Sequence, residues 1–188
     1  MAVYSRPRRG ERARRWLPSP NADGAPLTFL VKRRRPGWLH VYLPVRPNGS
    51  TGWVRAPAVS LAVDDYGVRV DLRRHRITVR QDRKLVDDEP IGVGRAVTPT
   101  PSGRYYIVEL LQPPDPNGLY GPYAFGLSAY SPVLTGFAGG TGEIGIHGTN
   151  FPQGLGTDVS HGCIRMSNAG ITRLARRLPL GTPVLIVR

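Results

Sequence analysis

The chain has 188 residues, a formal net charge of +13 and a single cysteine. This length suits one ordinary domain plus a small accessory piece. One cysteine excludes an intrachain disulfide and a zinc site built from several thiolates. The basic residues are almost all arginines, and such a charge either favours anionic partners or reflects a basic, arginine-rich proteome.

Residues 1–24 are rich in Arg, Pro, Gly and Ser, and their composition predicts a basic disordered tail. Its arginines are expected to be solvated, with contact to an anionic polymer as the alternative. The tail contains no apolar run typical of a signal peptide, and no segment of the chain is long enough to span a membrane.

Residues 25–63 are predicted to form a small all-β module. Turn signals at Pro36-Gly37 and at 47–49 separate two short runs in which apolar residues alternate. The alternating residues are Leu27, Phe29 and Val31 in the first run and Leu39, Val41 and Leu43 in the second. The module is expected to form a small barrel or, alternatively, to add strands to the main domain, and to give structural support or bind a partner.

Residues 64–188 are predicted to form the main domain. Alternating apolar residues indicate strands between 68 and 86, and 105–111 is a further predicted strand. The segment 113–122 is long and rich in proline and glycine, and long loops in compact domains are usually functional. It is expected to cover the active site, with Tyr120, Tyr123 and Tyr130 either contacting a peptide or serving as core or surface aromatics.

One helix is predicted near the C-terminus. Ile171, Leu174, Ala175 and Leu178 are spaced for one helical face, and Ser167 or Asn168 can cap its start. Pro179 is expected to end it, and residues 184–187 return as a strand.

Cys163 and the histidines near it carry the chemistry. A thiol is mostly protonated at neutral pH, so a catalytic cysteine needs a nearby base. His161 is only two residues away, and so short an arc restricts its approach to the sulfur. His147 ends a separate apolar run and is therefore assigned as base and later acid, with its second ring nitrogen held by a backbone carbonyl or by Thr149.

Gly162 precedes the cysteine and permits a tight turn. The N–H groups of Gly162 and Cys163 are then expected to point at a developing oxyanion, which suits acyl transfer. In the alternative, His147, His161 and Cys163 hold a catalytic zinc ion, but the glycines favour acyl transfer, and no metal or cofactor is expected.

The residues around Cys163 resemble the active-site signature of the L,D-transpeptidases, the YkuD-type enzymes that cross-link bacterial peptidoglycan. His147 is followed, after the expected gap, by Ser160-His161-Gly162-Cys163-Ile164. The resemblance extends to TPTPSGRYY (98–106), YGPYAFGLS (120–128) and GTPVLIV (181–187). Arg165 stands where the shortest form of the signature has Asn. Residues 25–63 resemble the small barrel that precedes the catalytic domain in some actinobacterial members.

The resemblance implies a mainly β fold, with a YkuD-like β-sandwich catalytic domain carrying one C-terminal helix. It implies that Cys163 forms a thioester with a peptidoglycan stem peptide, while His147, His161 and Gly162 assist catalysis. Substrate contacts are expected from Arg165, whose alternative role is a structural ion pair, and from Ser160, Gly148, Thr149 and Tyr130. His161 either stabilises the oxyanion or orients the thiol, or it only bonds within the turn.

The resemblance also implies a location outside the cytoplasmic membrane. A monomer is expected, with anionic cell-wall polymers as possible partners. A non-catalytic wall-binding protein is the alternative function. Nucleic acid binding is not expected, because the arginines are scattered and no recognition helix or aromatic platform is evident.

Overall fold

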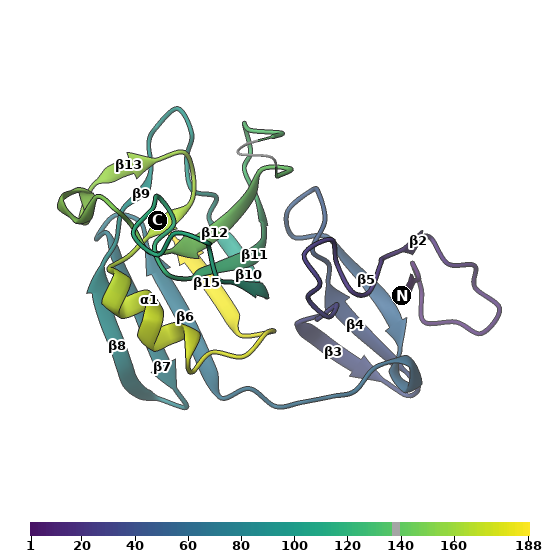
Figure 1. The fold of residues 1–188 in the computed structure, drawn as a ribbon. Helices are drawn as coiled ribbons and strands as arrows, with labels where there is room; N and C mark the ends of the chain where they lie inside the picture. Colours follow the sequence, from purple (N-terminus) through teal and green to yellow (C-terminus); the bar gives the residue numbers. More distant parts are fainter. Residues whose placement is uncertain (137–139) are drawn as a thin grey trace.

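The computed structural model describes residues 1–136 and 140–188. Two β-rich bodies are joined by an extended linker, the smaller one formed by the N-terminal part of the chain (Figure 1). Within the described ranges, α1 (Asn168–Ala175) is the only α-helix. No helix in these ranges is long and apolar enough to cross a membrane. The predicted fold class, mainly β with one clear C-terminal helix, is confirmed.

The smaller body contains an antiparallel sheet of three strands, β3 (Val31–Arg35), β4 (Trp38–Tyr42) and β5 (Thr51–Arg55), in that order. Its turns contain the predicted proline and glycine residues, and Gly37 has a φ of +73°, which suits the tight turn after β3. A short 3-10 helix, η1 (Ala56–Ala58), follows β5. Leu39, Val41 and Val54 fill the core on one face of the sheet.

The first residues are ordered, contrary to the prediction of a disordered tail over 1–24. β1 (Ala2–Val3) pairs with β2 (Arg15–Trp16), and Tyr4 forms a bridge with Trp53 in β5. The side chains of Val3 and Leu17 are buried in the core of the smaller body. These few apolar residues among many arginines give little local signal, and they become ordered because the sheet offers them a core.

The larger body is built on a curled sheet of eight strands in the order β14-β12-β11-β10-β15-β6-β7-β8. Two pairs of neighbouring strands in this sheet, β15 with β6 and β12 with β14, run parallel, and the other neighbouring pairs are antiparallel. The strands predicted between 68 and 86, at 105–111 and at 184–187 are present, each with slightly wider bounds. The strands are β6 (Tyr66–Asp71), β7 (Arg76–Gln81), β8 (Lys84–Pro90), β10 (Gly103–Leu111), β11 (Ala124–Tyr130), β12 (Glu143–His147), β14 (Ile164–Arg165) and β15 (Pro183–Val187).

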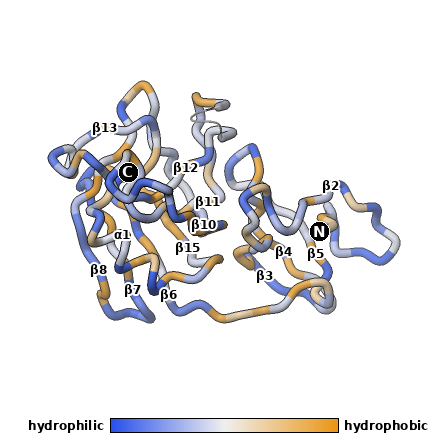
Figure 2. Tube along the Cα trace, viewed as in Figure 1, coloured by the Kyte–Doolittle hydropathy of each residue, from blue (hydrophilic) through white to orange (hydrophobic). Residues whose placement is uncertain are grey.

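Smaller elements lie beside this sheet. β9 (Val93–Gly94) and β13 (Asp158–Ser160) form a separate parallel pair, and η2 (Pro152–Gly154) is a single 3-10 turn. Hydrophobic stretches lie along the strands within the larger body, whereas hydrophilic residues occupy many of its turns (Figure 2). The core therefore lies where the alternating apolar residues of the strands meet the buried face of α1.

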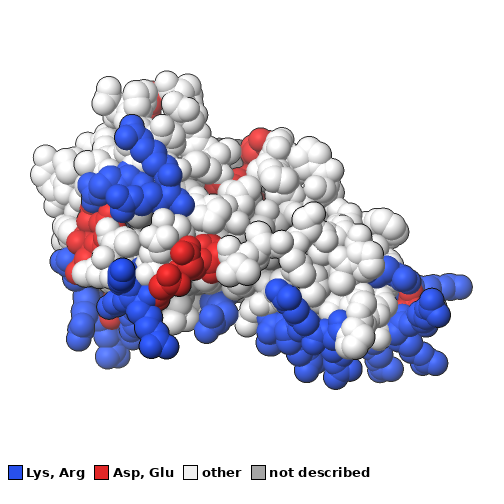
Figure 3. All heavy atoms as spheres, turned by 90° about the horizontal axis from the view of Figure 1, so that it is seen from below, with Lys and Arg blue, Asp and Glu red and all other residues white. Residues whose placement is uncertain are grey.

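The positive charge is concentrated on the smaller body. Residues 1–63 contain 12 of the 26 basic side chains and 2 of the 13 acidic ones, a net charge of +10. Figure 3 shows Lys and Arg side chains gathered over the smaller body, while both signs of charge occur on the larger one. The remaining residues contribute a net charge of only +3.

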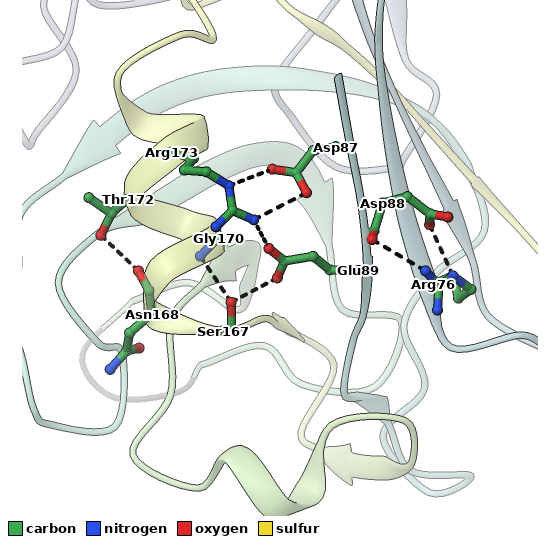
Figure 4. Close-up of polar contacts among 9 residues, drawn as sticks. All are labelled: Arg76, Asp87, Asp88, Glu89, Ser167, Asn168, Gly170, Thr172 and Arg173. Carbon is green, nitrogen blue, oxygen red and sulfur yellow. Dashed lines mark hydrogen bonds and ion pairs between the residues drawn. The ribbon is translucent and has the colours of Figure 1, made fainter. Parts of the chain in front are cut away.

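Ser167 is the N-cap of α1. The sequence had left Ser167 and Asn168 as the two candidates for this position. The Ser167 Oγ accepts a hydrogen bond from the Gly170 N–H at 2.9 Å and donates one to Glu89 at 2.8 Å. Arg173, in the last turn of the helix, pairs with Asp87 at 3.1 Å and also with Glu89, so α1 is fastened to β8 near both of its ends (Figure 4).

The helix ends earlier than the prediction placed it. Its last residue is Ala175, four positions before Pro179, although Leu178 is still buried. The end of an α-helix often tightens into turns, which retain the packing of the last apolar residue.

Candidate active site

Two neighbouring strands bring the predicted histidine and cysteine together. His147 is the last residue of β12, and β14 begins directly after Cys163 and runs parallel to β12, with His147 opposite Arg165. Because alternate residues of a strand share a face, the side chains of Cys163, Arg165 and His147 project to the same side. All three line one cavity.

The cavity wall comes from four parts of the chain. They are the end of the loop before β11, the segment between β11 and β12, the start of β12 and the turn before β14. The other lining residues are Leu119, Tyr120, Ser131, Leu134, Gly142, Glu143, Ile144, Ser160 and His161.

His147 is held as a neutral base. It is 3% exposed, and its Nδ1 lies 2.6 Å from the Gly148 carbonyl oxygen, which is the backbone alternative predicted for this nitrogen. Because a carbonyl only accepts, Nδ1 carries the proton and Nε2 is left as the basic nitrogen. Burial lowers the pKa of His147 to about 4, with a smaller lowering from the charge of Arg165.

Cys163 is partly exposed in the cavity. Burial raises the pKa of its thiol, while the Gly145 N–H, 3.4 Å from Sγ, and the charge of Arg165 lower it. The thiol and the imidazole are therefore both neutral near pH 7.

The turn before β14 differs from the prediction in one respect. The Ser160 Oγ accepts a hydrogen bond from the Gly162 N–H at 3.0 Å and donates one to the Cys163 carbonyl at 2.6 Å. The Gly162 N–H is thus used inside the turn and is not directed at an oxyanion. Of the two predicted donors, the Cys163 N–H is the one left as a candidate.

Gly162 has the conformational role that its sequence position indicated. Its φ is +124°, and a Cβ there would lie 3.0 Å from Ile144 Cδ1. A side chain at this position would therefore combine backbone strain with a close contact against β12.

Thr98 and Thr100 support the same turn, and the sequence analysis assigned them no role. The Thr98 hydroxyl donates to the Ser160 carbonyl at 3.3 Å. The buried Thr100 hydroxyl donates to the Gly162 carbonyl at 2.8 Å and accepts from the Gly94 N–H at 2.9 Å. Only the resemblance of 98–106 to the family could have drawn attention to them, because they are about 60 residues from the cysteine.

Gly148 and Thr149, predicted as substrate contacts, lie away from the cavity lining. Both are buried, and the Thr149 N–H donates to Asn168 Oδ1 at 2.8 Å. Gly148 supplies the carbonyl that orients His147. Gly148 therefore orients the histidine, whereas Thr149 is bonded to Asn168 at the start of α1.

The tyrosines separate into two groups. The ring of Tyr120 lines the cavity and meets the His147 ring edge-on, with centroids 4.9 Å apart. Tyr130 points elsewhere, because its hydroxyl donates to the Pro44 carbonyl in the smaller body at 2.9 Å. The structure thus brings Tyr120 to the cavity but not Tyr130.

Arg165 and His161 complete the predicted set. Both line the cavity, with His161 exposed at its rim. The buried Nε of Arg165 has no hydrogen-bond partner among the described residues, and the ion pairs found in these ranges do not include this side chain. The ion-pair alternative for Arg165 is therefore not observed.

A metal site is not indicated. Among the described residues, no group of three or more His, Cys, Asp and Glu side chains is placed to hold a metal ion. The titratable side chains that line the cavity are those of Tyr120, Glu143, His147, His161, Cys163 and Arg165.

The site therefore lies in a curled, mainly β domain, with His147 at the end of β12 and Cys163 directly before the neighbouring parallel strand β14. Residues 65–186 match the family model of the YkuD L,D-transpeptidase catalytic domain, and the chain belongs to this family.

The relatives agree with this assignment. The chain is 35% identical over 123 residues to YkuD of Bacillus subtilis, which bears the name of an L,D-transpeptidase, and the match covers 65% of this chain and 66% of that protein. A structure described as the Ldtfm–avibactam carbamoyl enzyme is 25% identical with a TM-score of 0.52, covering 67% of this chain and 50% of its own.

A third relative supports the fold. L,D-transpeptidase 3 from Mycobacterium tuberculosis, in complex with a faropenem-derived adduct, has a TM-score of 0.54 at 18% identity, covering 80% of this chain and 68% of its own. The chain therefore spans about half to two thirds of the length of these relatives.

Proposed function

We propose that this protein is an L,D-transpeptidase that cross-links peptidoglycan stem peptides through a thioester on Cys163. The observation that carries the proposal is the geometry of the Cys163 and His147 pair. Both side chains line one cavity, and the Gly148 carbonyl fixes the imidazole so that Nε2 is the basic nitrogen.

In the first half of the reaction, Cys163 Sγ attacks the amide carbonyl after the third residue of a tetrapeptide stem. The thiol proton moves to His147 Nε2 as the S–C bond forms. The C–N bond then breaks, and the same proton passes to the departing amine, which leaves as D-alanine. The acyl group remains on Sγ as a thioester.

In the second half, the side-chain amine of a diamino acid in another stem attacks the thioester. His147 removes a proton from this amine, the S–C bond breaks, and the sulfur recovers a proton from His147. One amide has been exchanged for another, so the reaction needs no nucleotide. Water in place of the amine gives a carboxypeptidase reaction as a side activity.

Arg165 is proposed to bind the carboxylate of the donor stem's diamino acid. Its side chain lines the same cavity as the thiol, and its buried Nε has no hydrogen-bond partner among the described residues. A carboxylate matches the planar fork of an arginine, which also favours the thiolate electrostatically. The Cys163 N–H is the proposed oxyanion donor, and His161 at the rim is proposed to assist.

The avibactam relative supports an acylatable cysteine, since its description is that of a carbamoyl enzyme. Incubation with a carbapenem tests this directly, because intact-mass spectrometry reports a covalent adduct on the protein. We expect one adduct per chain, none on Cys163→Ala, and formation at least about a hundredfold slower on His147→Ala.

The same experiment distinguishes the transpeptidase from the alternative function. A non-catalytic wall-binding protein would form no adduct, and its binding to peptidoglycan would be the same in Cys163→Ala. If the wild-type protein binds peptidoglycan but forms no adduct, the result contradicts the proposed reaction and supports the wall-binding alternative.

The proposed substrate implies that the protein works outside the cytoplasmic membrane, where peptidoglycan is assembled. Anionic cell-wall polymers are proposed as additional partners of the smaller body. Its residues 1–63 carry a net charge of +10, whereas the larger body carries +3. Long-range attraction would then bring the enzyme to an anionic wall.

One face of the smaller sheet is built as a rigid cationic surface. The guanidinium groups of Arg33 and Arg35 lie over the Trp53 ring at 5.1 and 5.6 Å, and that of Arg55 lies over Trp38 at 5.2 Å. The two Trp rings are buried beneath them. None of the ion pairs in the described ranges involves residues 1–63, so these cations are not neutralised by nearby carboxylates.

This surface favours a polyanion without bases over nucleic acid. Binding of single strands relies on aromatic rings that are open for base stacking. Here the rings of Trp38 and Trp53 are covered by arginines, so the exposed groups are charges.

A further inference from the structure

The turn between β4 and β5 reaches from the smaller body to the wall of the cavity. Arg46 Nη1 donates to the Ser131 carbonyl at 2.8 Å, and its Nη2 donates to the carbonyls of Leu134 and Thr141 at 2.9 and 3.0 Å. A single guanidinium therefore joins both limbs of the segment that connects β11 to β12. We call the described parts of this segment, residues 131–136 and 140–142, the wall segment.

Asn48, on the same turn, fixes the start of this segment. Its Nδ2 donates to the Tyr130 carbonyl at 2.8 Å, and its Oδ1 accepts from the Tyr130 N–H at 2.9 Å. The guanidinium of Arg46 lies 4.8 Å from the centre of the Tyr130 ring, whose hydroxyl is bound to the Pro44 carbonyl. The turn thus contacts the wall segment and the residue before it through both backbone and side-chain atoms.

The wall segment is part of the candidate active site. Ser131, Leu134 and Gly142 line the same cavity as Cys163. The Ser131 N–H donates to the Gly142 carbonyl at 2.8 Å and closes the base of the segment. A Cβ on Gly142 would lie 2.3 Å from the Leu134 carbonyl and 3.0 Å from Arg46 Nη2, so the packing here leaves no room for a side chain.

We propose that the β4–β5 turn is a structural part of the active-site wall, and that Arg46 is a positioning residue that sets the shape of the substrate cavity. The proposal rests on the proposed transpeptidase function of that cavity. The planar fork of arginine can bond several carbonyls at once, and this cross-link reduces the freedom of the wall segment. The accessory module therefore contributes to substrate binding indirectly, through the shape of the cavity wall.

Arg46→Lys is the decisive variant, because an ammonium group keeps the charge but lacks the fork that joins the two limbs. The rate of acylation is measured at a range of carbapenem concentrations. This gives two quantities, the maximal rate and the carbapenem concentration at which the rate is half-maximal. We expect the half-maximal concentration to rise about tenfold or more, as for a misplaced binding group, while the maximal rate changes much less.

Tyr106→Phe is the matched control. It removes the hydrogen bond of 3.2 Å from the Tyr106 hydroxyl to the Tyr42 carbonyl, which also joins the two bodies but lies outside the cavity lining. Its acylation should match that of the wild type. Equal losses in Tyr106→Phe and Arg46→Lys would assign the effect to general docking of the bodies and overturn the proposal, and so would wild-type kinetics in Arg46→Lys.

Hydrogen exchange gives a readout that does not depend on catalysis. Peptides from the wall segment should exchange faster in Arg46→Lys than in the wild type or in Tyr106→Phe. Unchanged exchange would overturn the proposal even if the carbapenem acylates every variant. Failure of the wild type to be acylated, with exchange accelerated in Arg46→Lys, would instead contradict the proposed function and leave the positioning role of Arg46 supported.

Discussion

His147 illustrates how burial sets the chemistry of a single residue. An exposed histidine near a thiol would often form an ion pair with the thiolate, but the surroundings of His147 lower its pKa to about 4. Burial also raises the pKa of the Cys163 thiol. Both effects disfavour charge, so the resting site stores a neutral base and a neutral nucleophile.

The same burial makes the stability of the protein depend on pH. The pKa of His147 is lower in the folded protein than its ordinary value of 6.5, so the unfolded chain binds a proton first as the pH falls. The histidine's contribution is fully present above about pH 6.5 and is lost progressively towards pH 4, by roughly 3 kcal/mol in total.

This prediction is tested by urea unfolding of wild type and His147→Gln between neutral pH and about pH 4.5. The glutamine amide does not titrate but can still donate to the Gly148 carbonyl. The wild type should lose more free energy of unfolding than the variant over this range. Parallel curves would show that carboxylates, and not this imidazole, govern the acid sensitivity.

At the scale of elements, α1 is held to β8 near both of its ends. Ser167 satisfies the Gly170 N–H and also bonds Glu89 on β8, while Arg173 pairs with Asp87 on the same strand (Figure 4). The helix therefore depends on a cap that is shared with the sheet.

Replacing Ser167 by Ala should lower the free energy of unfolding by about 1–2 kcal/mol, because it removes the cap and leaves a Glu89 oxygen without that donor. Chemical denaturation measures the change. Ala169→Ser, on the exposed side of the same turn, is the control and should stay within about 0.5 kcal/mol of the wild type. Similar effects of both substitutions would contradict a specific capping role.

For the whole molecule, the uneven charge leads to a prediction about binding. Long-chain polyphosphate, used as a probe for an anionic polymer, should bind the wild type more weakly as the NaCl concentration rises from about 50 to about 200 mM. Replacing Arg33 and Arg35 by Gln should weaken binding further, because it removes two charges from the cationic face.

The control variant carries Gln at Arg73 and Arg83, which are exposed on the larger body and give the same change in net charge. It should bind polyphosphate more tightly than the Arg33 and Arg35 variant. Equal weakening would mean that only the total charge matters. Tighter binding of single-stranded DNA than of polyphosphate would contradict a surface made for a polymer without bases.

The arrangement of the two bodies also separates what sequence patterns could predict from what they could not. The module at 31–55 and the strands from 66 to 90 follow from local alternation and turn residues, which are short-range signals. The ordered start of the chain was missed because Val3 and Leu17 become buried only against a sheet formed by later residues. Tyr130 was misplaced because its partners, Asn48 and Pro44, are more than 80 residues away.

The sequence by itself identified the candidate reacting groups, a lone cysteine after a glycine and a histidine at the end of an apolar run. Only the tertiary structure decided how they are held. The parallel pairing of β12 with β14 aligns His147 and Cys163, the Ser160 hydroxyl takes the Gly162 N–H, and Arg46 reaches the cavity wall from the other body. Each of these depends on which hydrogen-bonding groups meet in space, and that is fixed by packing of the whole chain rather than by any local pattern.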